Sequence, residues 1–275
     1  MDIVFVGAGR LATNLAKALT ADGGHTVTAV YSRTMEHADA LCRLVGGRAT
    51  DQIDELPLAA DAFILVVKDS AIAELLPRLT EGRQGQAFFH TSGSVPMSVF
   101  GNHACHGVIY PLQTFSKERQ VDFSHIPVFI EGNCERALQL AQTLAASVSR
   151  RVEQRTSEER HVLHLAAVFA SNFANHCYSL AAQVLEEAGM SFDVLLPIID
   201  ETARKVHSIH PREAQTGPAI RYDEQVIAGH LGMLRHDAMA HDVYQLMSQS
   251  IHSLSKNSHN DQLRPYTHPG HRLRH

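Results

Sequence analysis

The chain has 275 residues, which is enough for two compact domains with a proper core. Its hydrophobic content of 44% and charged content of 19% are typical of an ordinary water-soluble protein. The formal net charge of −5, without a basic run in the folded part, argues against nucleic-acid binding. No apolar stretch reaches membrane-spanning length without charges, and the run over residues 2–6 is too short for a signal peptide. Together with four widely spaced cysteines and no CxxC motif, these features predict a cytoplasmic protein that binds no membrane.

The N-terminus carries a dinucleotide-binding pattern. A short apolar strand over residues 2–6 leads into Gly7-x-Gly9-x-x-Ala12, where the glycines open a helix. In this pattern the first glycine permits the tight turn, the second lets the backbone approach a pyrophosphate, and Ala12 packs the helix on the strand. Amides at the helix N-terminus then hold the phosphates. The residues predicted to bind the cofactor here are Gly7, Ala8, Gly9, Arg10 and Leu11.

The end of the second strand, over residues 25–31, selects the cofactor. Proteins that bind NAD or FAD usually place Asp or Glu there to hold the ribose hydroxyls. This chain has Ser32, Arg33 and Thr34 instead, a guanidinium and two hydroxyls that suit a 2′-phosphate. We therefore predict NADP in preference to NAD. The alternative is that Arg33 is an ordinary solvated charge.

Further strands and helices alternate through the first half of the chain, which is typical of a parallel sheet with helical crossovers. The strands are expected at residues 62–67, 86–90, 107–110 and 127–130, and the helices at about 35–44, from 71, and 135–147. The fold class is therefore α/β, with an N-terminal Rossmann domain and a parallel-rich sheet over residues 1–155.

The second half of the chain is predicted to be all helical. Thr156 and Glu159 have the spacing of a capping box and introduce an apolar helix that ends near Gly189. A last helical segment is expected over about 223–250. We assign residues 156–252 to a helical substrate and dimerisation domain, and residues 253–275 to a disordered, histidine-rich tail.

The helix over about 160–188 is apolar on most of its circumference, so it should be buried nearly all round. A helical domain of only about a hundred residues can hardly bury it alone. Packing against the first domain or against another subunit is the economical explanation, so we expect a homodimer through the helical domain.

Ligands of open α/β sheets bind at the carboxyl ends of the strands. Three such ends are rich in polar groups: they begin at Lys68, at His90 and at Tyr110. They are either ordinary polar loops or the walls of a nicotinamide site. We take the second view and predict catalytic or orienting roles for His90 and Ser92.

The long helix carries a polar stripe on its apolar surface. His164, Ser171 and Asn172 fall near one face, an arrangement that is costly unless it is paired or faces a wet cleft. His164 is either a satisfied core histidine or a proton donor, Asn172 would orient the substrate, and Ser171 would bind it. In the loop before the last helical segment, Thr216 and Arg221 either belong to a capped turn or clamp the substrate.

No metal site is predicted. The pairs His236-Asp237 and His241-Asp242 resemble metal-ligand dipeptides, but no matching upstream set exists, so a solvated helix face is expected. Metal capture by the histidines of the tail is the alternative for that segment.

The chain resembles the bacterial Rossmann-like proteins with a C-terminal helical domain of unknown function, within the pyrroline-5-carboxylate reductase and 6-phosphogluconate dehydrogenase superfamily. The stretches that carry the resemblance are Phe5-Val-Gly-Ala-Gly-Arg-Leu11, His90-Thr-Ser-Gly93, Tyr110-Pro-Leu-Gln-Thr-Phe115, His164-Leu-Ala-Ala-Val-Phe-Ala-Ser-Asn172, and Thr216-Gly-Pro218 with Arg221 and Asp223. Val66-Val67-Lys68 is also similar to the loop that touches NADP in pyrroline-5-carboxylate reductases, although Asp69 replaces the proline.

The resemblance implies an NADP-binding domain that includes Val67, Lys68 and Asp69, a helical dimerisation domain, and a site between the two. In related hydroxyacid dehydrogenases the helix between the domains carries a catalytic lysine, which is missing between Arg160 and Gly189. We expect an NADP-dependent reductase of a small carbonyl or imine substrate. The alternatives are a non-catalytic NADP-binding sensor or regulatory protein, and an oxidoreductase that uses a deazaflavin partner.

Overall fold

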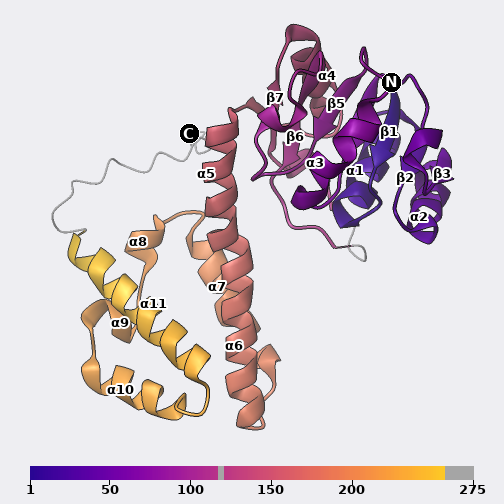
Figure 1. Cartoon of the computed structure of the whole chain (residues 1–275). Helices are drawn as coiled ribbons and strands as arrows, with labels where there is room; N and C mark the ends of the chain where they lie inside the picture. The colour runs from indigo at the N-terminus through magenta and orange to yellow at the C-terminus, as the bar shows by residue number, and fades with distance from the viewer. Residues whose placement is uncertain (117–120, 258–275) are drawn as a thin grey trace, which may run out of the picture. The chain divides into compact units, whose positions relative to one another are not determined.

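The computed structural model describes residues 1–116 and 121–257, and Figure 1 shows its helices and strands. The chain forms two compact units, Met1–Ala174 and a second unit that begins at Asn175. The last strand of the sheet ends at Gln154, and the next helix begins at Ser157. The boundary between the two units lies further along the chain, after Ala174 in the long helical segment.

The first unit is built on an eight-stranded sheet of order β3-β2-β1-β4-β5-β6-β7-β8. The strands are β1 (Asp2–Val6), β2 (Thr26–Tyr31), β3 (Arg48–Thr50), β4 (Ala62–Leu65), β5 (Ala87–His90), β6 (Cys105–Pro111), β7 (Val128–Gly132) and β8 (Val152–Gln154). Neighbours are parallel except for the antiparallel pair β6 and β7. The order of the first six strands is that of a dinucleotide-binding fold, with a topological switch point between β1 and β4. The predicted fold class is confirmed.

Two hydrophobic clusters cover the two faces of the sheet. Helices α1 (Arg10–Ala21), α2 (Met35–Val45) and α4 (Glu135–Ala146) contribute to one cluster, and α3 (Asp69–Thr80) contributes to the other. Both faces of the central strands are covered, so every residue of β4 and β5 is buried. This explains why those strands are continuous apolar runs in the sequence.

Two strands and the direction of a third were not predicted from the sequence. Strands β3 and β8 have three residues each and little apolar alternation, so they carry no local signal. The antiparallel direction of β7 depends on its pairing with β6, which no local pattern records. The apolar run after Ala62 is also interrupted earlier than predicted, because the strand ends at Leu65 and α3 begins at Asp69.

A long helical segment follows the sheet. Helix α5 (Ser157–Ala167) begins with the predicted capping box: the Thr156 hydroxyl accepts from the Glu159 amide, and the Glu159 carboxylate accepts from the Thr156 amide. A π-helical stretch over Val168–Phe173 separates α5 from α6 (Ala174–Glu187), and Gly189 follows with a left-handed φ of +69°. We expected this helical segment to be buried on all sides. In the single chain, large apolar side chains of the segment are exposed.

The described part of the second unit contains the rest of α6 and five more α-helices. They are α7 (Leu196–Lys205), α8 (Pro211–Ala214), α9 (Pro218–Arg221), α10 (Glu224–Met233) and α11 (Ala238–Asn257). The predicted single helix over 223–250 is therefore two helices. The break falls at Asp237, whose carboxylate accepts from the Ala240 amide and caps α11.

The predicted tail began too early, because α11 continues to Asn257. The remainder of that prediction, with the tail histidines, lies outside the described residues. No helix among the described residues is long and apolar enough to cross a membrane.

Candidate cofactor and active site

A cleft of about 670 Å³ lies in the first unit, along the carboxyl ends of its parallel strands. Every residue predicted to bind the cofactor lines it: Gly7, Ala8, Gly9, Arg10, Leu11, Ser32, Arg33, Thr34, Val67, Lys68 and Asp69. The cleft passes over the switch point of the sheet, which is where dinucleotides bind in open α/β folds. The structure thus brings residues from three separate loops into one site.

Gly7 and Gly9 have different structural requirements. Gly7 has a φ of +116°, and a Cβ at this position would lie 2.2 Å from the carbonyl oxygen of Val66. Its amide donates to the carbonyl of Tyr31, 2.7 Å away. At Gly9, by contrast, a Cβ would meet nothing within 4 Å. The first glycine is therefore required by the fold, and the second leaves open space above the backbone.

The N-terminus of α1 is suited to an anion. Gly9 is its N-cap and provides no side-chain hydrogen bond, and the first turn contains no acidic residue. Amides of the first turn of a helix lack intrahelical partners and carry partial positive charge. The exposed Arg10 adds a full positive charge at the same place. The open space at Gly9 and these donors fit the pyrophosphate of a dinucleotide.

The loop after β2 has the hydrogen-bonding groups that the sequence predicted. The Thr34 amide donates to the Ser32 hydroxyl at 3.4 Å, and the exposed Arg33 lies between them in the chain. His37, from the first turn of α2, also lines this end of the cleft and was not predicted. Glu36 is absent from the lining residues, so no acidic side chain of this loop takes the position of a ribose-binding carboxylate.

The other end of the cleft contains a pair of proton-bearing side chains. The hydroxyl of Tyr110, at the end of β6, lies 3.1 Å from Nδ1 of His164 on α5. Both residues line the cleft together with Gly93. Burial raises the pKa of Tyr110, the Arg160 charge acts against this rise and the Asp69 charge adds to it. The phenol therefore keeps its proton at neutral pH.

Arg160 attaches α5 to the first unit. Its side chain is 2% exposed and forms an ion pair with the Glu131 carboxylate of β7. Its Nε donates to the Ser92 carbonyl at 3.1 Å, and its Nη2 donates to the Val95 carbonyl at 2.6 Å. The sequence reading assigned no role to Arg160 or Glu131. The sequence feature that could have indicated a role for Arg160 is its position in an apolar helix, one residue after the capping box.

His90 and Ser92 belong to the end of β5 and the loop after it, and of the two only Ser92 lines the cleft. His90 is fully buried, does not line the cleft, and its Nδ1 accepts from the Ser92 amide at 3.2 Å. Burial, aided by the charge of Arg160, lowers the pKa of His90 to about 3, so its ring is neutral. The Ser92 hydroxyl accepts from the amides of Ser94 and Val95 and shapes the loop. His90 therefore holds the loop from behind the cleft, whereas Ser92 both shapes the loop and lines the cleft, so its orienting role stays a prediction.

The remaining predicted residues are not among those that line the cleft. Ser171 and Asn172 fall in the π-helical stretch, where the change of helical period ends the α-helical alignment with His164. Thr216 and Arg221 belong to the second unit, where both are exposed. Asp223, in the same segment, caps α10 by accepting from the Val226 amide, as the capped-turn reading of this loop required.

The described residues contain no group of three or more histidine, cysteine, aspartate or glutamate side chains that could hold a metal ion. One of the two candidate dipeptides pairs with a residue elsewhere in the chain, and the other pairs within itself. His236 pairs with Glu187 at 2.8 Å, and His241 lies 3.3 Å from Asp242.

The strand order, the glycine turn and the cleft define a dinucleotide-binding protein of the Rossmann class. A family model described as NADP oxidoreductase, coenzyme F420-dependent, matches residues 2–89, and one described as a domain of unknown function, DUF2520, matches residues 126–251. The chain belongs to the family of NADP oxidoreductases that combines these two domains, and the resemblance seen in the sequence is confirmed.

Solved structures support this assignment. A protein of Bacteroides fragilis, provisionally described as an NADP oxidoreductase, is 50% identical and has a TM-score of 0.88, covering 92% of this chain and 98% of its own. A Thermotoga maritima protein is 22% identical with a TM-score of 0.77, covering 92% and 99%. An imine reductase of Streptomyces aurantiacus is 14% identical with a TM-score of 0.64, covering 95% and 100%, and shows a shared fold. No curated protein matches the chain.

The two glycines of the turn should respond differently to alanine. Gly7→Ala should lower the free energy of unfolding by about 2–4 kcal/mol, because of the positive φ and the overlap with Val66. Gly9→Ala should change it by less than about 0.5 kcal/mol, yet raise the dissociation constant of NADPH at least about tenfold, since the methyl group enters the open space. Urea unfolding and calorimetry measure the two quantities. Wild-type affinity in Gly9→Ala would refute the phosphate assignment.

Stability should fall as the pH drops below about 6.5. His90 stays neutral in the folded chain down to a pKa of about 3, whereas the unfolded chain binds the proton near 6.5. The unfolded state therefore holds more protons between these values, and His90 contributes a loss of about 1.4 kcal/mol per pH unit. Urea unfolding at pH 7, 6 and 5 measures the slope. His90→Gln should flatten it and the exposed His161→Gln should not, and an equal slope in all three proteins would contradict the assignment.

Proposed function

We propose that this protein is an NADP-dependent reductase of small carbonyl or imine compounds. One observation carries the proposal. A single cleft combines a phosphate-binding turn at Gly9 with a hydrogen-bonded Tyr110–His164 pair at its far end. A reductase needs both a site that holds the dinucleotide and a proton source near the acceptor.

NADP is the cofactor that we propose, and Arg33 is the residue that selects it. The guanidinium is exposed at the end of β2, and the hydroxyls of Ser32 and Thr34 lie beside it in the chain. A planar guanidinium makes charge-assisted hydrogen bonds to a 2′-phosphate that a ribose hydroxyl cannot match. When bound, the reduced nicotinamide supplies a hydride. The chain itself supplies binding, orientation and a proton.

His164 takes part in the transfer of that proton, and Gly93 gives it room. Ser92 and His90 hold the loop that carries Gly93, so they act through its position. A substrate-orienting role stays a prediction for four further residues: Asn172, Ser171, Thr216 and Arg221.

A cytoplasmic location is part of the proposal, because the four cysteines are free thiols, as expected in a reducing compartment.

The cofactor assignment predicts a selective effect of Arg33→Ala. The variant should bind NADPH about 10–100-fold more weakly, which corresponds to the loss of one or two charge-assisted hydrogen bonds. Its affinity for NADH should not change. Arg43→Ala is the matched control, since Arg43 is exposed on α2 but does not line the cleft. The chain has no tryptophan, so titration would follow the fluorescence of the reduced nicotinamide or the heat of binding. Equal losses for NADH and NADPH would refute the phosphate pocket.

Turnover separates a reductase from a non-catalytic NADP-binding sensor. The assay is NADPH consumption with a panel of small aldehydes, ketones and cyclic imines. A deazaflavin is included because the matched family model is described as coenzyme F420-dependent. Oxidation of NADPH with one carbonyl or imine class supports the proposal. Tight NADPH binding without any turnover would favour the sensor, and reaction with the deazaflavin alone would favour that partner.

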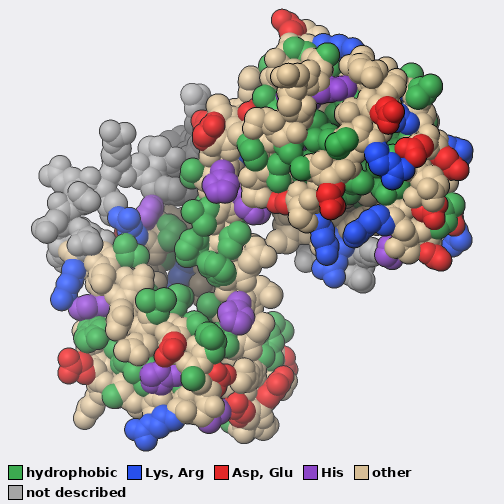
Figure 2. Space-filling model, in the orientation of Figure 1, with side chains coloured by type: hydrophobic (Ala, Val, Ile, Leu, Met, Phe, Trp, Pro, Cys, Tyr) green, Lys and Arg blue, Asp and Glu red, His purple; other side chains and the backbone are tan. Residues whose placement is uncertain are grey.

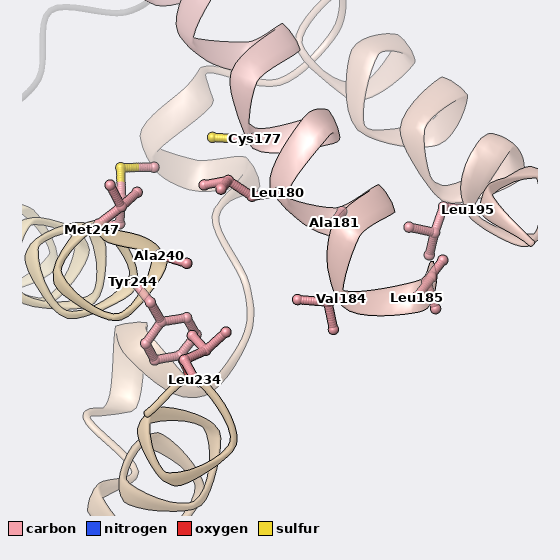
Figure 3. A pocket seen from close by; sticks show the side chains of 11 residues that line it. Cys177, Leu180, Ala181, Val184, Leu185, Leu195, Leu234, Ala240, Tyr244 and Met247 are labelled. Carbon is pink, nitrogen blue, oxygen red and sulfur yellow. The ribbon is translucent and has the colours of Figure 1, made fainter. Parts of the chain in front are cut away.

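We also propose that the protein is a homodimer through its helical segments. Large apolar side chains are exposed along them, including Val162 and Phe169 before the unit boundary and Met239 after it. Hydrophobic side chains are visible on this surface in Figure 2. The second unit also has an apolar groove of about 450 Å³, lined by residues such as Leu180 and Met247 (Figure 3). So much exposed apolar surface is unusual in a monomer, and a second copy would cover it.

The dimer predicts a mass of about twice the 30.3 kDa of the chain in light scattering. Val162→Glu should shift the protein toward the monomer, because Val162 is 67% exposed on α5. Leu58→Glu is the matched control, since Leu58 is 66% exposed and belongs to the segment before β4, outside α5 to α11. A monomeric wild type at micromolar concentration would refute the dimer.

A further inference from the structure

Tyr110 and His164 are held together by a close approach of the backbone at Gly93. A Cβ at this position would lie 2.6 Å from Nδ1 of His164 and 2.8 Å from Cζ of Tyr110. The two rings meet edge to face, with centroids 6.2 Å apart. Their positions are also fixed independently, because Tyr110 ends a buried strand and His164 lies one helical turn after Arg160. The pair is therefore a built feature of the cleft wall.

The two members of the pair differ in their access to water. Tyr110 is 9% exposed, whereas His164 is half-buried on α5. A reducible carbonyl or imine carbon must lie near the nicotinamide and away from bulk water. The more buried Tyr110 is therefore better suited than His164 to contact the substrate. The more accessible imidazole is the member that can exchange protons with solvent.

Two charged groups act on Tyr110, Asp69 from α3 and Arg160 from α5, and Glu131 of β7 is the ion-pair partner of Arg160. The Asp69 carboxylate accepts from the Ser94 hydroxyl, and Arg160 is committed to Glu131 and to backbone carbonyls. These charged groups affect the electrostatic potential at the pair, and their own hydrogen-bonding atoms are already paired. The phenol of Tyr110 and the imidazole of His164 are therefore the groups that transfer the proton.

We propose that Tyr110 is the catalytic acid of this site and that His164 is the relay that returns the proton from solvent. This assignment rests on the proposed reductase function. As the hydride adds to the substrate carbon, the C=O or C=N π bond breaks, and the oxygen or nitrogen takes the proton of the Tyr110 hydroxyl. The His164 imidazole takes up a solvent proton at Nε2 and gives its Nδ1 proton to the phenolate oxygen, which restores the Tyr110 hydroxyl. Exchange of the remaining ring proton with water returns the imidazole to its Nδ1–H form, so each turnover consumes one hydride and one solvent proton.

The first test needs no cofactor. Nitrogen NMR of ¹⁵N-histidine-labelled protein reports the tautomer and the titration midpoint of each ring, and the His164 signal is identified by its loss in His164→Gln. Tyr110→Phe should shift the His164 signals and their midpoint. Tyr244→Phe is the matched control, because the Tyr244 hydroxyl lies 2.7 Å from Nδ1 of His230 in the second unit, so it should shift His230 alone. A His164 spectrum that Tyr110→Phe leaves unchanged would overturn the pair.

The second test assigns the order of the relay. Tyr110→Phe should lower the rate of hydride transfer by roughly 10²–10⁴-fold, with an NADPH dissociation constant within about twofold of wild type. His164→Ala should also be slow, but added imidazole should restore it, because a small base can replace a relay that is open to water. Imidazole should not restore Tyr110→Phe, and Tyr244→Phe should turn over normally.

Three outcomes overturn the assignment. Turnover of Tyr110→Phe within threefold of wild type would remove Tyr110 as the acid. Failure of imidazole to restore His164→Ala, with Tyr110→Phe still active, would make His164 the terminal donor. A wild type that binds NADPH and turns over no substrate would refute the reductase function itself. In that case the NMR would still report an intact pair, so the two failures are distinguishable.

Discussion

The rest of the site depends on one interaction, the buried ion pair between the guanidinium of Arg160 and the carboxylate of Glu131. The guanidinium is charged and almost without exposure to solvent. It also binds the Ser92 and Val95 carbonyls and the Ser157 hydroxyl, so most of its donors are used. A buried charge that loses its partner costs about 3–5 kcal/mol, and such a network accepts few alternative geometries. One side chain thus fixes α5 against β7 and against the loop after β5.

The placement of His164 follows from this attachment. The capping box at Thr156 starts α5, and Arg160 follows at the end of its first turn. His164 comes one turn later on the same face of the helix. The loop that receives the guanidinium is also the loop that contains Gly93, so the same contact brings the imidazole onto the glycine and next to the phenol of Tyr110. His90, buried and neutral, also supports that loop, because its Nδ1 accepts from the Ser92 amide.

The residues of the glycine turn could be predicted because their requirements are local. A strand, a glycine with positive φ and a helix N-terminus are properties of a few consecutive residues, and Gly7 and Gly9 fulfil them where the pattern places them. The same holds for the capping box. The short strands β3 and β8 could not be predicted, since three residues contain too little periodicity, and the two-helix form of residues 223–250 depends on a single cap at Asp237.

The sequence by itself determined the dinucleotide fold, the family, and the glycine turn and the loop after β2 that line the cleft, because short-range backbone preference and the order of strands and helices specify them. The tertiary structure decided which side chains meet at the far end of the cleft. Tyr110 and His164 are 54 residues apart in the chain, and Arg160 and Glu131 are 29 apart. Only packing sets such distances. For the same reason, only the tertiary structure showed that His90 is fully buried and does not line the cleft.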